Sequence, residues 1–445
     1  MAVQHVIIGN GAAGLTAAEA VRAHDDQAEI LILGDEPHGF YSRPGLAYLL
    51  TGELPERQLF SRLEEDYRRQ RIRKRTARVQ NLYPVEHQLA LVNGERVTYD
   101  RLLLALGSSA AALQLPNTDL AGVVYLDNLA DARRLVKLAR RARRAVVVGG
   151  GVTALEVVEG LRARKVQVHY LLRRERYWSN VLDADESQLV LEHLKRDGVQ
   201  VHPRTEIAKL IGKRGRLRAV ETTQGATIRC DILGVSIGVR PRVQLAQAAG
   251  LEIDRGILVN EFLETSAPDV YAAGDVAQVT DPLTGQANLD VLWSIALEQG
   301  RNAGLNMAGR KTPYRKTVPF NVTRLAGIVT TLIGAVGRVK EHDADVVAIT
   351  RGDSETWRGI ANVLVAEDDK ETNRLRLMVR GERIVGAVVM GDQSLSRPLH
   401  WLIAAQADIG PIRTALLEPQ APIETIITDY WHAWERAHAT TAQQS

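Results

Sequence analysis

The order of apolar and polar positions at the start of the chain predicts a strand, a tight turn, a helix and a second strand. An apolar, β-branched run at residues 5–8 leads into a glycine-rich segment at 9–14, and an alanine-rich stretch continues to about residue 23. The next apolar run is at 29–33. Buried parallel strands have such near-continuous apolar runs, so we expect a βαβ unit of a parallel sheet here.

The glycine-rich segment has the residue types that a dinucleotide-binding turn requires. Gly9 permits a tight turn, Gly11 lets backbone N–H groups approach a pyrophosphate, and Gly14 lets the helix pack closely on the strand. The N-terminus of the helix would face the anion. Asp35 lies 21 residues after Gly14, at the end of the second strand, where an acid accepts hydrogen bonds from ribose hydroxyls.

The same order of elements returns about 140 residues further along the chain. A strand is predicted at 145–148, a glycine-rich turn at 149–151, a helix to about residue 163 and a strand at 166–172. The third small residue of this turn is Ala154 instead of glycine. Two such units predict two bound dinucleotides. A flavin with a nicotinamide is the natural pair, because hydride passes between them.

The residues that follow the predicted strand at 166–172 help to determine which nicotinamide coenzyme is bound. Arg173 and Arg174 stand there, beginning 19 residues after Ala154, where a carboxylate would favour NAD. Guanidinium groups would instead pair with the 2′-phosphate of NADP. The alternative is that both arginines are solvated surface charges beside Glu175. The pattern favours NADP and leaves NAD open.

The C-terminal part of the chain predicts an α+β domain. Residues 318–322 and 327–332 alternate like strands, and 375–380 with 383–390 is typical of a hairpin closed by a two-residue turn. Helices are expected after these strands, at 396–407 and 423–438.

Composition and charge exclude several classes of protein. The 445 residues suggest about three domains. Hydrophobic residues make up 45% and charged residues 24%, which is ordinary for a chain with a large core. The net charge of +3 argues against a dedicated nucleic-acid-binding protein. No apolar run approaches the roughly 20 residues that span a bilayer, and no signal peptide precedes the first strand. We therefore expect a cytoplasmic protein without a membrane partner.

Cysteine and histidine usage limits the chemistry further. Cys230 is the only cysteine, which excludes an internal disulfide, a CxxC pair and a thiolate metal cluster. We interpret it as a small apolar core residue. Histidines such as His5, His38 and His169 lack metal-ligand spacing, so no metal site is predicted. Any redox chemistry would depend on a bound cofactor.

Three further segments resemble one known family. Residues 99–108 look like the strand and turn that close a flavin half-domain, and 230–241 resemble the return strand from a nicotinamide domain. The most specific match is 265–275. Together these motifs resemble the FAD-dependent pyridine nucleotide oxidoreductase family, densely over about residues 3–310. The resemblance implies an α/β, glutathione reductase-like fold with two Rossmann-like domains, in which Asp275 hydrogen-bonds the ribityl chain of FAD.

Two more segments are similar to ferredoxin and rubredoxin reductases and to the flavoprotein half of NADH-dependent nitrite reductases. By this resemblance 41–46 would lie beside the flavin pyrophosphate and ring. Residues 293–301 would form a helix whose N-terminus points at the ring, where it stabilises negative charge on reduced flavin. Disulfide reductases of the family carry cysteine where Pro44 stands, so thiol chemistry is excluded here. Tyr48 replaces a lysine that ferredoxin reductases often have, and Glu156 is the best candidate for a residue near the nicotinamide.

The resemblance also implies a domain order. The FAD domain is expected at 1–113 and 245–317, the NAD(P) domain at 114–244, and a C-terminal α+β domain at 318–445 that either covers the flavin or forms the interface of a homodimer. No side chain is predicted to act as a catalytic acid or base. The residues expected to contact the cofactors are Gly9, Gly11, Ala12, Ala13, Gly14, Asp35, Glu36, Arg43, Pro44, Val79, Ala105, Gly107, Gly149, Gly151, Ala154, Glu156, Arg173, Arg174, Gly274, Asp275 and Trp293.

We therefore expect an oxidoreductase that passes electrons from NAD(P)H through FAD to an external acceptor. The alternatives are an NAD(P)H oxidase or quinone reductase without a protein partner, and a flavoprotein subunit with a structural or signalling role. Two basic clusters are most simply solvated helix faces, and the alternative is a docking surface for an acidic electron-transfer protein. The first basic cluster is Arg68, Arg69, Arg71, Arg73, Lys74, Arg75 and Arg78, and the second basic cluster is Arg133, Arg134, Lys137, Arg140, Arg141, Arg143 and Arg144.

Overall fold

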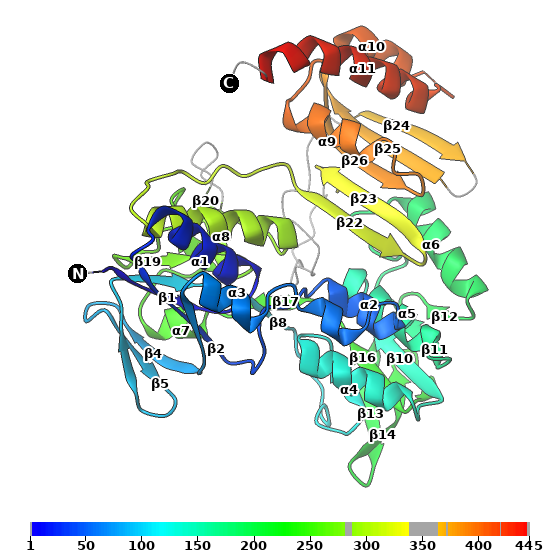
Figure 1. Cartoon of the computed structure of the whole chain (residues 1–445). Coiled ribbons are helices and arrows are strands. Elements are labelled where there is room, and N and C mark those ends of the chain that lie inside the picture. Colours follow the sequence, from blue (N-terminus) through cyan, green and yellow to red (C-terminus); the bar gives the residue numbers. More distant parts are fainter. Residues whose placement is uncertain (1, 281–286, 338–363, 371–372, 419, 443–445) are drawn as a thin grey trace. The chain divides into compact units, whose positions relative to one another are not determined.

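The computed structural model of the chain describes residues 2–280, 287–337, 364–370, 373–418 and 420–442, which form two compact units. Unit 1 contains the described residues of 1–173 and 204–316, and unit 2 contains those of 174–203, 317–346 and 356–445. Unit 1 thus holds both predicted glycine-rich turns, and unit 2 holds the predicted C-terminal α+β region (Figure 1). The predicted domain boundaries stay predictions.

The first parallel sheet of unit 1 has the strand order β19-β7-β1-β2-β3. Strands β1 (Gln4–Ile8) and β2 (Glu29–Gly34) are those predicted on either side of the first turn, and they pair in parallel. The sheet continues with β7 (Arg101–Leu104) and β19 (Val270–Ala272) beyond β1, and with β3 (Ile72–Thr76) beyond β2. The apolar side chains of β7 and most of those of β1 and β2 are buried. This is the expected environment of a parallel sheet covered on both faces.

The second parallel sheet repeats this plan. Its strands in unit 1 have the order β11-β10-β16-β9 and bounds Gln167–Leu171, Arg144–Val148, Ile232–Val235 and Val123–Tyr125. Strand β10 pairs in parallel with both β11 and β16. Two βαβ units on two parallel sheets confirm the prediction of two Rossmann-like folds.

The helices and smaller sheets of unit 1 complete these two cores. Its helices are α1 (Ala12–His24), α2 (Gly45–Thr51), η1 (Glu56–Leu59), α3 (Glu64–Arg69), α4 (Leu129–Ala139), α5 (Val152–Ala163), α7 (Gln244–Ala248) and α8 (Trp293–Met307). The smaller sheets are β4-β5-β6 (Val79–Tyr83, Gln88–Leu91, Arg96–Thr98), β13-β14-β15 (Ile207–Lys213, Arg216–Thr222, Thr227–Arg229), β17-β8 (Val239–Pro241, Ser108–Ala110) and β18-β20-β21 (Ile257–Val259, Ala277–Thr280, Ala287–Leu289).

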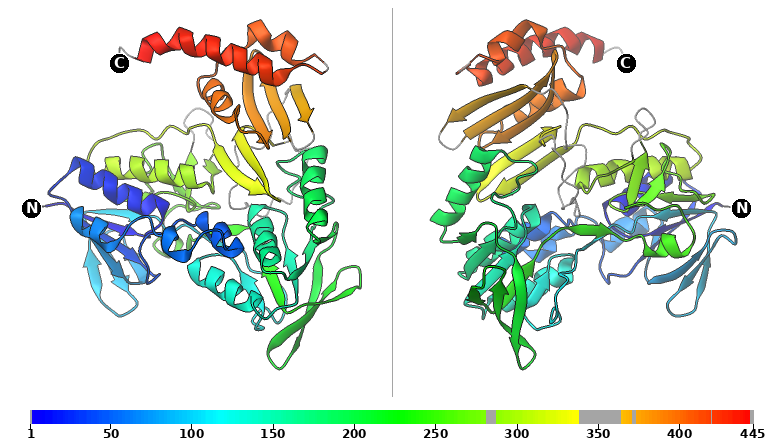
Figure 2. Two further views of the ribbon diagram at one scale, coloured as in Figure 1. Left: turned by 45° about the vertical axis from the view of Figure 1, so that its right-hand side comes forward. Right: turned by 180° about the vertical axis from the view of Figure 1, so that it is seen from behind.

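Helices α1 and α8 lie side by side in unit 1 (Figures 1 and 2). A Cβ at Gly300 would lie 2.3 Å from the carbonyl oxygen of Ala13, and one at Gly304 would lie 2.4 Å from that of Ala17. Glycine at these two positions lets the two backbones touch. The paired order, 300 with 13 and 304 with 17, means that the helices run in the same direction. Their N-termini therefore lie at the same end of the pair.

Unit 2 contains the antiparallel sheet β22-β23-β26-β25-β24, with α9 and α11 against one face (Figure 2). The turn Gly381–Glu382 closes the predicted hairpin. Along β25, Leu375, Leu377 and Val379 join the core formed with α9 and α11. The elements of this unit are α6 (Ala184–Arg196), β12 (Gln200–His202), β22 (Phe320–Leu325), β23 (Ile328–Gly334), β24 (Leu364–Lys370), β25 (Asn373–Arg380), β26 (Arg383–Met390), α9 (Ser396–Ala404), α10 (Gly410–Leu416) and α11 (Ile423–Ala442).

The sequence did not predict α10, because Gly410-Pro411 is typical of a turn. Pro411 lies in the first turn of the helix, where its missing N–H removes no helical hydrogen bond. The predicted helix at 396–407 ends earlier, at Ala404. Among the described residues, no helix has both the length and the apolar character needed to cross a membrane.

Candidate functional site

The first glycine-rich turn is shaped by close backbone contacts. Gly9 has a φ of +117°, and a Cβ there would lie 2.1 Å from the carbonyl oxygen of Ala105. A Cβ at Gly14 would lie 1.9 Å from the carbonyl oxygen of Gly9. A Cβ at Gly11, by contrast, would meet no described atom within 4 Å. The turn itself therefore requires Gly9 and Gly14, whereas Gly11 borders open space at the start of α1.

Both glycine-rich turns lead into a helix whose N-terminus no described side chain caps. The N-cap residues are Gly11 for α1 and Gly151 for α5, and neither helix has an acid in its first turn. Helix α4 is instead capped by Asn128 and helix α6 by Asp183. The free N–H groups of α1 and α5 suit an anion, so each turn fits the pyrophosphate of a dinucleotide.

Two acids follow β2, and the structure separates their roles. Asp35 is exposed and has no hydrogen-bond partner among the described residues. The carboxylate of Glu36 accepts one 2.8 Å hydrogen bond from Tyr41 Oη and another of 2.8 Å from Arg43 Nη2. Burial raises the pKa of Tyr41, so its phenol remains a donor at neutral pH. Asp35 is thus open to ribose hydroxyls, and Glu36 orients Arg43.

Arg43 also connects the two halves of unit 1. Its Nη1 donates to the backbone carbonyl of Asp127, just before α4. The carboxylate of Asp127 accepts a 2.8 Å hydrogen bond from Arg242 Nη2, and the N–H of Arg242 donates to the carbonyl of Gly107 at 3.0 Å. Pro44 follows as the N-cap of α2. Sequence reasoning missed Asp127 and Arg242, because neither lies in a recognisable motif.

Two hydrogen bonds hold the turn at Gly274 and Asp275. Gly274 has a φ of +79°, and its N–H donates to Oε1 of the buried Gln299 at 2.7 Å. Ser108 Oγ donates to Oδ2 of Asp275, also at 2.7 Å. The other carboxylate oxygen of Asp275 accepts no hydrogen bond from a described residue. Ser108 and Gln299 both lie in segments that resemble the family. A serine and a glutamine are common residue types, however, so the sequence alone did not indicate that these two side chains hold the turn.

The remaining residues expected near the flavin lie in the same unit. Ala12 and Ala13 are buried at the start of α1, and a Cβ at Gly274 would lie 3.1 Å from that of Ala13. Trp293 is the first residue of α8, with its ring 5.7 Å from that of Phe40. Val79 begins β4 and packs against the core of the first sheet. A helix does begin at Trp293, as predicted, and its position beside a flavin ring stays a prediction.

The second turn differs from the first at its third small residue. Gly149 has a φ of +143°, and a Cβ there would lie 2.0 Å from the carbonyl oxygen of Ser236. The same Cβ would lie 3.1 Å from the methyl group of Ala154, which is fully buried. The strand and helix therefore accommodate one methyl group between them here. Glu156, two residues further along α5, is half-buried.

The two arginines after β11 are not equivalent. Arg173 is exposed and has no partner among the described residues. Arg174 is half-buried, and its Nη1 donates to Oδ1 of Asn180 at 2.7 Å. Arg173 is therefore the better candidate for a contact with a 2′-phosphate.

The described residues contain neither an accessible thiol nor a group of side chains that could hold a metal ion. Cys230 is buried, and burial raises the pKa of its thiol to about 12, an effect that the neighbouring Asp231 increases. A thiolate is therefore scarce at neutral pH. Within the described ranges, no group of three or more His, Cys, Asp and Glu side chains could hold a metal ion.

The two basic clusters differ in how their charges are compensated. The first basic cluster is not a single helix face, since it runs from the end of α3 into β3. Its ion pairs are Arg69 with Asp66, Arg73 with Glu29, Lys74 with Glu64, and Arg75 with Glu95. The second basic cluster is exposed along α4 and up to the start of β10. Arg133 pairs with Glu56, and none of the other six side chains forms an ion pair within the described residues.

Comparisons with known proteins agree with this geometry. The family model described as pyridine nucleotide-disulphide oxidoreductase matches residues 3–300. The ferredoxin–NAD(+) reductase component of the biphenyl dioxygenase system of Paraburkholderia xenovorans (strain LB400) is 34% identical over 361 residues, covering 80% of this chain and 85% of that protein. The nitrite reductase [NAD(P)H] of Bacillus subtilis (strain 168) is 26% identical over 420 residues, or 94% of this chain. The chain spans only 49% of that relative's length.

The fold is also similar to that of solved structures. The crystal structure of the covalent putidaredoxin reductase–putidaredoxin complex contains a chain with a TM-score of 0.83 to this one. The two share 23% sequence identity, and the match covers 96% of this chain and 98% of that chain. This agreement confirms the predicted fold class, with two Rossmann-like parallel sheets and a C-terminal antiparallel sheet.

Proposed function

The chain belongs to the pyridine nucleotide-disulphide oxidoreductase family, and on this basis we propose that it passes electrons from NAD(P)H through FAD to a small external electron carrier of the ferredoxin or rubredoxin type. It is an FAD-dependent NAD(P)H oxidoreductase by family, and its single cysteine leaves it without an internal disulfide. The observation that carries the proposal is the pair of glycine-rich turns, each leading to a helix N-terminus that no described side chain caps.

When bound, FAD supplies the chemistry of hydride acceptance and electron transfer, which no side chain of this chain provides. The N–H groups at the start of α1 would bind its pyrophosphate, and Asp35 would accept hydrogen bonds from its ribose. The free oxygen of Asp275 would bind the ribityl chain. The N-terminus of α8 would stabilise negative charge near Trp293.

The second turn would bind the nicotinamide coenzyme. The N–H groups at the start of α5, after Gly149 and Gly151, would bind its pyrophosphate. Ala154 would pack the helix against the strand, and Glu156 would lie near the nicotinamide. Arg173 would bind a 2′-phosphate, which favours NADPH over NADH. These roles leave the chemistry to the coenzymes and assign positioning to the protein.

Electrons must then leave for an acceptor outside the chain, because the buried Cys230 has no partner thiol. The Paraburkholderia relative is named as a ferredoxin reductase component, and the solved complex contains putidaredoxin. The six side chains of the second basic cluster that form no ion pair would attract an acidic carrier of this kind. The first basic cluster is a weaker candidate, since its main charges are already paired.

An anaerobic stopped-flow experiment on the FAD-loaded protein tests this function. We expect NADPH to bleach the flavin absorbance and the reduced protein then to reduce a [2Fe–2S] ferredoxin or a rubredoxin. The charge-reversal variant Arg140→Glu/Arg141→Glu should slow the second step several-fold at low salt and less at high salt. Arg73→Glu, in the first basic cluster, is the matched control. Fast oxygen or quinone reduction with no carrier reduction would identify an oxidase or quinone reductase instead.

A further inference from the structure

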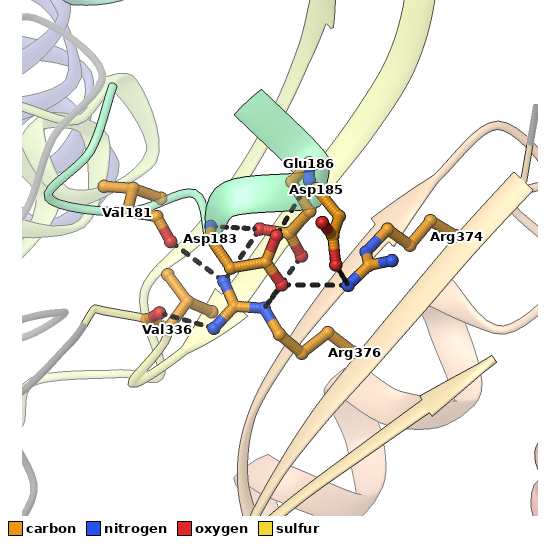
Figure 3. Close-up of polar contacts among 7 residues, drawn as sticks. All are labelled: Val181, Asp183, Asp185, Glu186, Val336, Arg374 and Arg376. Atoms are coloured by element: carbon orange, nitrogen blue, oxygen red, sulfur yellow. Dashed lines mark hydrogen bonds and ion pairs between the residues drawn. The ribbon is translucent and has the colours of Figure 1, made fainter. Parts of the chain in front are cut away.

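We propose that Arg374 and Arg376 of β25 fix the segment that directly follows Arg173, and thereby the orientation in which Arg173 meets the nicotinamide coenzyme. This segment, residues 174–183, is called the coenzyme loop here. It begins directly after Arg173 and ends at the start of α6, and it lies in unit 2 together with β25. Figure 3 shows Val181 and Asp183 of this loop beside Arg374 and Arg376. The inference rests on the proposed function, in which Arg173 contacts the 2′-phosphate.

Arg376 joins the coenzyme loop to α6. Its Nε lies 2.7 Å from one carboxylate oxygen of Glu186, and its Nη2 lies 3.0 Å from the other (Figure 3). The same Nη2 donates to the backbone carbonyl of Val181, within the loop, at 2.9 Å. Only 5% of the Arg376 side chain and none of the Glu186 side chain is exposed. A planar guanidinium that bonds both groups fixes the distance between them.

Arg374 binds the last residue of the loop. Its Nη2 lies 3.1 Å from Oδ2 of Asp183 and 3.4 Å from Oδ2 of the exposed Asp185. Asp183 is also the N-cap of α6, since it accepts from the N–H of Glu186 at 2.8 Å while the Glu186 carboxylate accepts from the N–H of Asp183 at 2.8 Å. The two arginines therefore hold a helix terminus that already has a defined geometry.

The interior of the coenzyme loop is packed and hydrogen-bonded. The carbonyl of Tyr177 accepts a 2.6 Å hydrogen bond from Ser187 Oγ of α6. The carbonyl of Trp178 accepts from the N–H groups of Val181 at 2.9 Å and Leu182 at 3.0 Å. The side chains of Tyr177, Trp178, Val181 and Leu182 are buried. A segment fixed in this way has few conformations, so the position of its first residues follows from that of its last.

The alternation of side chains along β25 allows the strand to contribute to the apolar core and to the ion pairs at the same time. Leu375 and Leu377 face the apolar core with α9 and α11, so Arg374 and Arg376 project from the opposite face of the strand. If arginines and acids were replaced together, apolar residues of similar size would stabilise the fold about as well as these buried ion pairs do, whereas removal of one partner alone leaves a buried charge. What the arginines add is orientation. A preorganised loop lowers the entropic cost of ordering Arg173 on the coenzyme.

The test compares Arg376→Met with Arg380→Met in the FAD-loaded protein. Arg380 lies on the same strand but is exposed and has no partner among the described residues. We expect calorimetric titration with NADP+ to give a Kd roughly tenfold higher for Arg376→Met, equivalent to about 1.4 kcal/mol. Backbone hydrogen exchange should become faster in 174–183, while FAD per chain stays at the wild-type value. Arg380→Met should match the wild type in all three measurements.

Arg376→Lys keeps a buried positive charge opposite Glu186 but loses the planar fork, so the variant should fold and its Kd should shift in the same direction. A wild-type Kd for NADP+ in either variant would overturn the inference. Loss of FAD in parallel with loss of NADP+ binding would also overturn it, because it would indicate general unfolding. A wild-type protein that binds neither NADP+ nor NAD+ would overturn the proposed function itself.

Discussion

Ser108 Oγ donates a 2.7 Å hydrogen bond to Oδ2 of Asp275, joining residues 167 positions apart in the chain. Ser108 begins β8 and is buried, and Asp275 follows the turn after β19. The bond occupies one carboxylate oxygen of Asp275 and leaves the other without a hydrogen bond to any described residue. Asp275 is therefore held in one orientation before any ligand arrives, which lowers the cost of binding.

Asp275→Ala should weaken FAD binding by roughly 10- to 100-fold, since a hydrogen bond to a charged group contributes about 1.5–3 kcal/mol. Ser108→Ala should weaken it less, because the carboxylate remains but is less well oriented. The FAD-to-protein ratio after gel filtration, and the Kd from titration of the apoprotein, measure both effects. Full FAD occupancy in Asp275→Ala would exclude the proposed role of this carboxylate.

Gly11→Ala and Gly14→Ala should separate cofactor binding from folding. The new methyl group at Gly11 points into open space that the pyrophosphate would occupy, so FAD affinity should fall while the apoprotein keeps its melting temperature. At Gly14 the methyl group would lie 1.9 Å from a backbone oxygen, so the apoprotein itself should be less stable. Thermal unfolding of the two apoproteins distinguishes the cases. Equal destabilisation by both substitutions would contradict the assigned roles.

Arg173→Ala should reduce the preference for NADPH by roughly 10-fold or more, because one charge-assisted contact contributes about 1.5–3 kcal/mol. Arg174→Ala is the matched control and should have a smaller effect, since Asn180 already engages that guanidinium. The ratio of kcat/KM for NADPH and NADH in flavin reduction is the measurement. Faster reduction by NADH, unchanged in Arg173→Ala, would mean that both arginines are surface charges.

Cys230→Ser should retain NAD(P)H-driven flavin reduction within a few-fold. The thiol is buried, and its pKa of about 12 keeps it protonated at neutral pH. The native protein should also react slowly with a thiol-modifying reagent and quickly once unfolded. A folded, FAD-loaded variant that no longer accepts electrons from NAD(P)H would show that the thiol takes part in turnover.

The buried His5 on β1 should make the protein less stable in mild acid. Burial lowers its pKa from 6.5 to about 4, so below pH 6.5 the unfolded chain binds a proton that the folded chain does not. Stability is therefore lost as the pH falls from about 6.5 toward 4. Between pH 7 and pH 5 the loss from this residue is about 2 kcal/mol. Urea unfolding should show a correspondingly smaller loss in His5→Val.

The exposed His432 of α11 provides the control for this pH dependence. Its replacement by glutamine should leave the difference in unfolding free energy between pH 7 and pH 5 at the wild-type value. An equal difference in wild type and His5→Val would show that His5 is not the group responsible.

The sequence by itself determined the two glycine-rich turns, the strands and helices around them, the C-terminal hairpin and the absence of thiol pairs. These features depend on local patterns: a β-branched run, glycines at set spacings, and the helical or strand period of apolar residues. Gly9, Gly11 and Gly14 were identified because their spacing, between an apolar strand and a helix, is the local pattern of a dinucleotide-binding turn.

Only the tertiary structure decided which side chains meet across long separations. Ser108 with Asp275, Asp127 with Arg242, and Arg376 with Glu186 are 167, 115 and 190 positions apart. Serines, arginines and acids are common at surfaces, so their types carry no signal of such pairing. The pairs form because the return of the chain to each sheet, and the alternation of side chains along β25, bring them together. For the same reason Asp35 and Glu36, adjacent in sequence, differ in the folded protein: one is open to solvent and the other is bonded to Tyr41 and Arg43.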